Sequence, residues 1–172
     1  MNFLLRYGNR RFSTATKTYP KTFDKILIAN RGEISRRVIK TCRKMGIETV
    51  CVYSDADRHS MFVREADEAY RIGPPPTNQS YLDMNKILDV VKQTGAQAVH
   101  PGYGFLSENK HFQKLLHDNG VSFIGPPGPA ITAMGDKLES KKLAKSAKVN
   151  TVPGYVGEIH DDKEVIKISN EI

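Results

Sequence analysis

The feature that most constrains the fold is a regular alternation between short apolar runs and longer stretches of helical periodicity. Residues 25–29 (KILIA) form a nearly continuous apolar run, which is typical of a strand buried on both faces of a parallel sheet. Residues 33–45 then carry one apolar helical face, formed by Ile34, Val38, Cys42 and Met45. A second apolar run over residues 47–53 follows Gly46, which is the expected end of the helix. These segments predict a β–α–β unit.

The same alternation continues along the chain. Helices are expected over residues 60–67, 83–93 and 109–116, and strands over residues 69–72, 96–99 and 121–124. Residues 73–81 contain three consecutive prolines and are expected to form an exposed loop. Later segments predict a short helix ending near residue 134, a basic helix over 136–147 and a helix over 161–172. Strands that alternate with helices in this way predict an α/β fold, with a parallel sheet flanked by helices.

Residues 100–109 (HPGYGFLSEN) join an expected strand to an expected helix. Gly102 and Gly104 permit a positive φ or a close backbone approach, and we expect Tyr103 between them to be displayed at the surface. Ser107 and Glu108 are candidates to cap the next helix. Ligands of open α/β sheets bind at the carboxyl ends of strands, where this loop is expected to lie. From spacing alone, a ligand loop and an ordinary capped turn remain equally good interpretations.

A dinucleotide site is the first alternative that such a unit suggests. Asp55 follows the second strand and would bind the ribose of a nicotinamide or flavin cofactor. However, the turn after the first strand offers only Gly32, where the phosphate-binding fingerprint needs three glycines. Asp55 and Asp57 are therefore interpreted as turn and cap residues. An α/β nucleotide-binding domain of unrelated chemistry is disfavoured for the same reason.

The positive charge of the chain is concentrated at its beginning. The net charge is +7, but residues 1–22 hold five basic residues and no acidic one, so the remaining 150 residues carry 21 basic and 19 acidic side chains. This distribution gives no reason to expect a nucleic-acid partner, and no apolar run is long enough to span a membrane. An arginine-rich, hydroxyl-rich and acid-free beginning predicts a mitochondrial transit peptide, with a disordered basic arm as the alternative. Cys42 and Cys51 have no metal-ligand spacing, which is compatible with a reducing mitochondrial matrix.

Five blocks of sequence, in the same order, resemble the biotin carboxylase family. They are residues 28–34 (IANRGEI), 54–57 (SDAD), 66–69 (ADEA), 100–109, and 123–126 (FIGP) together with 134–137 (MGDK). The resemblance runs from about residue 23 to the end of the chain. Residues 139–145 and 149–154 are most similar to the propionyl-CoA branch of the family, with the methylcrotonoyl-CoA and pyruvate branches as alternatives.

The composition assigns residues 1–22 to the transit peptide. The resemblance implies two further segments: a Rossmann-like biotin carboxylase N-terminal domain over 23–131 and the truncated beginning of an ATP-grasp domain over 132–172. It implies a ligase that uses ATP, bicarbonate and Mg²⁺ (or Mn²⁺) to carboxylate biotin. The implied partners are a biotin carrier domain and the carboxyltransferase β subunit of an acyl-CoA carboxylase. That separate subunit sets the acyl-CoA specificity.

The resemblance also assigns roles to a few residues. Lys137 matches the lysine that contacts ATP, and Tyr103 and Gly104 match the loop on the biotin side of the reaction centre. Arg31 and Glu33 match a region of contact between carboxylase domains, although a solvated helix face explains them equally well. No catalytic residue and no metal ligand of the family falls within this chain. We therefore expect the chain alone to be inactive, and a non-catalytic short product that binds a carboxylase subunit is the alternative.

Overall fold

The structure is a computed structural model that describes residues 22–157 and 159–171, except for the side chain of residue 171. Most of the predicted transit peptide, residues 1–21, lies outside the described residues. The chain divides into two compact units, one ending at Pro126 and the other beginning at Pro127.

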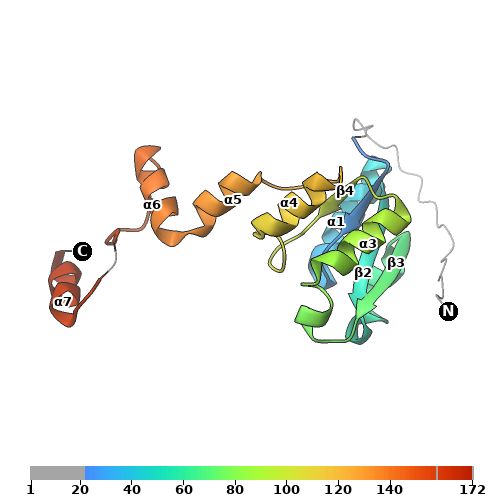
Figure 1. Cartoon of the computed structure of the whole chain (residues 1–172), viewed down its shortest axis with the longest axis horizontal. Coiled ribbons are helices and arrows are strands. Elements are labelled where there is room, and N and C mark those ends of the chain that lie inside the picture. The colour runs from blue at the N-terminus through green and yellow to red at the C-terminus, as the bar shows by residue number, and fades with distance from the viewer. Residues whose placement is uncertain (1–21, 158, 172) are drawn as a thin grey trace. The chain divides into compact units, whose positions relative to one another are not determined.

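The first unit is a five-stranded parallel sheet with helices between the strands (Figure 1). Its strands are β1 (Lys25–Ile28), β2 (Glu48–Ser54), β3 (Glu68–Gly73), β4 (Ala98–His100) and β5 (Ser122–Phe123). Its helices are α1 (Gly32–Met45), α2 (Met61–Glu65), α3 (Met84–Thr94) and α4 (Lys110–Asp118), with short 3-10 turns η1 (Asp55–Asp57) and η2 (Thr77–Gln79). The strand order is β3-β2-β1-β4-β5. The predicted α/β fold is confirmed.

Alternate side chains of the central strands pack against different helical layers. Leu27 of β1 belongs to a cluster with residues of α3 and α4, including Ile87 and Phe112. Ile28, its neighbour, packs instead with Ile39 of α1 and Phe62 of α2. A strand places successive side chains on opposite faces, so this division puts helices on both faces of the sheet. Burial on both faces explains why the strands have nearly continuous apolar sequences.

Several local predictions were wrong in an informative way. Asn109 caps α4, because its Oδ1 accepts hydrogen bonds from the backbone N–H groups of His111 and Phe112 at 2.9 and 3.0 Å. The candidates Ser107 and Glu108 do not act as the cap. In α1, Cys42 is buried and Val38 and Met45 pack against the core as predicted, but Ser35 and Ile39 are buried as well, and Ile34 is only partly buried.

The region predicted as an exposed loop contains one of the most buried side chains of the unit. Tyr81 is only 1% exposed, and Ser80 beside it is fully buried. The three prolines do form an irregular connection, and η2 follows them. Proline-rich and polar composition indicates exposure, but at the end of this segment the chain turns inward and buries Ser80 and Tyr81.

The described residues of the second unit form the helices α5 (Gly128–Gly135), α6 (Lys137–Ser146) and α7 (Asp162–Glu171). Asp136 caps α6 by accepting hydrogen bonds from the backbone N–H groups of Leu138 and Glu139, both at 2.8 Å. The predicted basic helix over residues 136–147 is thus present, with Asp136 as its cap. In neither described part of the chain is there a helix of the length and apolarity that a membrane span requires.

Candidate functional site

The strand order reverses between β1 and β4, whose carboxyl ends lie side by side. The chain proceeds from β1 outward to β2 and β3, and then returns to β4 on the other side of β1. In open α/β sheets, ligands bind at the point where the strand order reverses in this way. Ile28 pairs with His100 in the sheet register, so the segments that follow these two residues, Asn30 and the 100–109 loop, meet there.

The 100–109 loop displays Tyr103 at this edge. Gly102 and Gly104 on either side both have φ +68°, a conformation that residues with a Cβ rarely adopt. Tyr103 is 79% exposed. The expectation that it is displayed rather than buried is therefore confirmed. Its proposed contact with biotin, like that of Gly104, stays a prediction.

Asn30 connects β1 directly to this loop. Its buried side-chain amide donates hydrogen bonds to the carbonyl oxygens of Pro101 and Tyr103, both at 2.8 Å. Its Oδ1 accepts a hydrogen bond from the backbone N–H of Arg31 at 2.9 Å. An Asn side chain has two N–H donors, and here both hold the backbone of the loop. This role was not anticipated from the sequence, because the partners lie more than 70 positions away.

Two further contacts fix the start of the loop. A Cβ added to Gly102 would lie 2.7 Å from Nδ2 of Asn30, so the amide leaves room only for glycine. The backbone N–H of Gly102 donates to Nδ1 of His100 at 3.0 Å. Burial lowers the pKa of His100, which favours the neutral imidazole that this acceptor role requires.

A buried carboxylate lies behind the loop. Asp57 is only 5% exposed and pairs with Arg31 at 2.6 Å, while its other oxygen accepts a hydrogen bond from the Tyr81 hydroxyl at 2.6 Å. Burial alone would raise the pKa of Asp57, but the hydrogen bonds from Arg31 and Tyr81 outweigh it and lower that pKa. Asp55 and Asp57 lie in the turn η1, as predicted, and Asp57 is in addition the centre of a polar network that the sequence did not indicate. Asp55 forms an exposed ion pair with Arg71 at 2.7 Å.

Lys137 lies in the second unit, whereas Tyr103 and Gly104 lie in the first. It is the first residue of α6, directly after the capping residue Asp136, and its side chain is exposed. The N–H groups of Leu138 and Glu139 in the first turn of α6 are already paired with Asp136, so the Lys137 ammonium is the group there that could pair with a phosphate. Among residues 22–157 and 159–171, no group of three His, Cys, Asp or Glu side chains could hold a metal ion.

The family model described as "Biotin carboxylase, N-terminal domain" matches residues 22–131. This match covers more than half of the chain and includes β1 to β5 and the 100–109 loop. The chain belongs to the biotin carboxylase N-terminal domain family. The resemblance inferred from the five sequence blocks is confirmed.

Curated relatives include α chains of propionyl-CoA carboxylases. The mitochondrial chain of Rattus norvegicus is 64% identical over 152 residues, which is 88% of this chain and 21% of the relative. The chain of Ruegeria pomeroyi is 63% identical over 150 residues, covering 87% of this chain and 22% of the relative. A mitochondrial methylcrotonoyl-CoA carboxylase subunit α of Glycine max is 54% identical over 148 residues, covering 86% of this chain and 20% of that relative. The chain spans about a fifth of the length of these relatives.

Solved biotin carboxylases share the fold. The biotin carboxylase domain of Hydrogenobacter thermophilus 2-oxoglutarate carboxylase, crystallised with MgADP, ADP and bicarbonate, has a TM-score of 0.79 and 47% identity. The match covers 88% of this chain and 33% of that one. A biotin carboxylase from Campylobacter jejuni, in complex with a β,γ-ATP compound, has a TM-score of 0.79 and 37% identity, covering 87% of this chain and 33% of that one. Members of the family thus bind adenine nucleotides, and one was crystallised with magnesium and bicarbonate.

Proposed function

We propose that this chain forms the N-terminal part of a biotin carboxylase, the component that carboxylates biotin in a biotin-dependent acyl-CoA carboxylase. The observation that carries the proposal is the family match over residues 22–131, together with a fold that presents the 100–109 loop at the ligand-binding edge of the sheet. In the complete enzyme, ATP supplies the energy to activate bicarbonate, and biotin accepts the carboxyl group. Mg²⁺ (or Mn²⁺) would be held by parts of the enzyme outside the described residues.

We propose that Lys137 contributes to ATP binding. Lys137 is the first residue of α6, and because Asp136 already accepts from the N–H groups of Leu138 and Glu139, the Lys137 ammonium itself would supply the contact with phosphate. Tyr103 and Gly104 would border the biotin side of the reaction centre. The exposed ring of Tyr103 offers an apolar surface for the bicyclic ring of biotin, and Gly104 has open space where a Cβ would be.

The propionyl-CoA branch is the proposed substrate class. The similarity to the propionyl-CoA carboxylase α chains of rat and Ruegeria pomeroyi supports this choice. In the sequence, residues 139–145 and 149–154 most resemble the same branch. The partners would then be a biotin carrier domain and a carboxyltransferase β subunit. A mitochondrial matrix location is supported by the acid-free, arginine-rich beginning of the chain and by the mitochondrial α chains of rat and human.

The decisive substitution is Lys137→Ala in a complete biotin carboxylase that contains this segment. Losing a charged contact with phosphate, worth about 1.5–3 kcal/mol, raises the KM for ATP about 10- to 100-fold. Lys145→Ala is the matched control, since Lys145 is another exposed lysine further along α6. Equal KM values in the two variants would make Lys137 an ordinary surface residue.

Tyr103→Ala in the same enzyme tests the biotin side independently. Removing the exposed ring is expected to raise the KM for free biotin while the KM for ATP stays unchanged. An unchanged KM for biotin would contradict the assignment of the loop.

A further inference from the structure

The Tyr81 hydroxyl is fully engaged behind the 100–109 loop. It donates a hydrogen bond to Oδ2 of Asp57 at 2.6 Å and accepts one from the backbone N–H of Ser54 at 3.1 Å. Ser54 Oγ is also 3.2 Å from the same Asp57 oxygen. These three residues are each at most 5% exposed. A buried polar group with all of its partners in place has one preferred geometry, so the network fixes the position of the Tyr81 ring.

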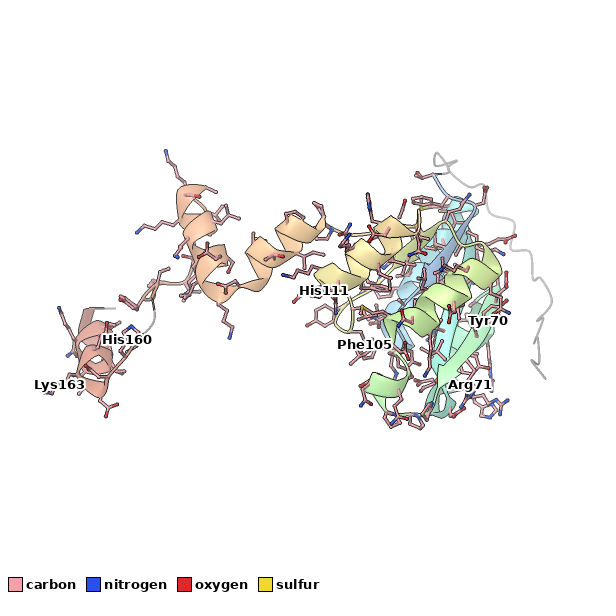
Figure 2. All side chains as sticks on the ribbon, in the orientation of Figure 1. Tyr70, Arg71, Phe105, His111, His160 and Lys163 are labelled. Carbon is pink, nitrogen blue, oxygen red and sulfur yellow. The ribbon has the colours of Figure 1, made fainter. Side chains whose placement is uncertain are left out.

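The Tyr81 ring in turn supports the loop. It stacks on Phe105, with ring centroids 5.2 Å apart and an angle of 3° between the planes (Phe105 is labelled in Figure 2). Phe105 has φ +45°, a left-handed conformation that is unfavourable for a residue with a Cβ. The stacked ring is a contact that can hold Phe105 in this conformation. Phe105 follows Gly104 directly and is two residues from Tyr103.

We propose that Asp57 and Tyr81 are positioning residues, which set the conformation of the 100–109 loop through Phe105. The chain of contacts runs from the Asp57 carboxylate to the Tyr81 hydroxyl, through the Tyr81 ring to Phe105, and so to the backbone that carries Tyr103. Asn30 holds the other side of the same loop. The consequence for biotin rests on the proposed function, in which Tyr103 borders the biotin site.

Amide hydrogen exchange in this chain tests the positioning role without reference to activity. The reporters are the loop N–H groups that are hydrogen-bonded within the loop: Gly102 to His100, Ser107 to Gly104 and Asn109 to Leu106. Tyr81→Phe removes only the hydroxyl and is expected to accelerate their exchange by about tenfold or more, which is the effect of one hydrogen bond on an opening equilibrium. Phe105→Leu removes the stacking and leaves the buried network intact, and it should give the same result.

Tyr70→Phe is the matched control. The Tyr70 hydroxyl also donates to a carboxylate, that of Glu68, at 2.8 Å, but it lies on β3, away from Phe105 (Figure 2). In the Tyr70→Phe chain, the amide exchange rates of the 100–109 loop should equal those of the unsubstituted chain. Equal loop exchange in the Tyr81→Phe, Phe105→Leu and Tyr70→Phe chains, with unchanged circular dichroism, would overturn the positioning role.

The same substitutions in a complete carboxylase test the functional consequence. Tyr81→Phe and Phe105→Leu are expected to raise the KM for biotin about tenfold and to leave the KM for ATP within about twofold, while Tyr70→Phe changes neither. If Tyr103→Ala raises the KM for biotin and Tyr81→Phe does not, the positioning role is wrong. If Tyr103→Ala itself has no effect, the proposed function of the loop fails, and the exchange experiment judges the positioning role separately.

Discussion

Gly102 and Gly104 form a natural matched pair for testing how the 100–109 loop is held. Both have φ +68°, so an alanine at either position destabilises the folded chain by the same amount, about 1–2 kcal/mol, through its left-handed backbone conformation. Alanine also restricts the unfolded chain, which returns about 0.4–1 kcal/mol at either position. Gly104→Ala should therefore cost about 1 kcal/mol, since a Cβ there meets nothing within 4 Å.

Gly102→Ala carries an additional cost. Its Cβ would lie 2.7, 2.8 and 2.9 Å from Nδ2, Cγ and Cβ of Asn30, so the Asn30 side chain must move. That movement breaks the hydrogen bonds from Asn30 to the carbonyls of Pro101 and Tyr103. Each hydrogen bond lost from a buried group lowers the free energy of unfolding by about 1–3 kcal/mol. With partial relaxation of the surrounding structure, the loss of both Asn30 hydrogen bonds should cost about 2–4 kcal/mol. The free energy of unfolding should fall by about 3–5 kcal/mol in total.

Urea unfolding followed by circular dichroism measures this difference. With a slope of about 1–3 kcal/mol per molar urea, the midpoint for Gly102→Ala should lie about 1 M or more below that for Gly104→Ala, with unchanged slopes. Equal midpoints for the two variants would refute the reasoning. In that case, contact with the Asn30 amide would not explain why position 102 is a glycine.

Three further predictions concern titratable groups. Because burial lowers the pKa of His100, the unfolded state binds a proton at a higher pH than the folded state does, and the free energy of unfolding should fall as the pH drops through about 6.5. In urea titrations at several pH values, His100→Asn should weaken this dependence. The pKa of Asp57 is lowered, so its carboxylate stabilises the fold above about pH 4, and the loss of stability in Asp57→Asn should diminish as the pH falls below that value. Asp55→Asn removes an exposed ion pair and should lower the free energy of unfolding less than Asp57→Asn at every pH above about 4. Burial raises the pKa of Cys42 to about 11 and raises the pKa of Cys51 as well. A maleimide should therefore label neither thiol at neutral pH until urea unfolds the chain, and rapid labelling of the native chain would contradict their burial.

Local patterns in the sequence were sufficient for the alternating strands and helices and for the display of Tyr103. Continuous apolar runs and helical stripes are signals within a few residues, and the two glycines mark the exposed turn directly. The fold class followed from these signals, because strands that alternate with helices have few other ways to pack.

The residues that hold the loop could not be found in this way. Asn30 reaches Pro101 and Tyr103 across 71 and 73 positions, and Tyr81 reaches Asp57 across 24. Tyr81 also stands in a proline-rich stretch whose composition indicates exposure. Such contacts depend on which strands become neighbours, and periodicity does not encode that information. A polar residue directly after a buried strand, as Asn30 is, was the one available signal.

The central claim, that this sequence functions as part of a biotin carboxylase, is tested most directly by two blots of one mitochondrial extract. One blot uses an antibody raised against residues 23–157, and the other uses streptavidin. The account predicts that both detect the same band, several times larger than this chain and carrying biotin. A band no larger than this chain, 19.3 kDa, that the antibody detects and streptavidin does not would contradict it, and would favour a non-catalytic product that binds a carboxylase subunit.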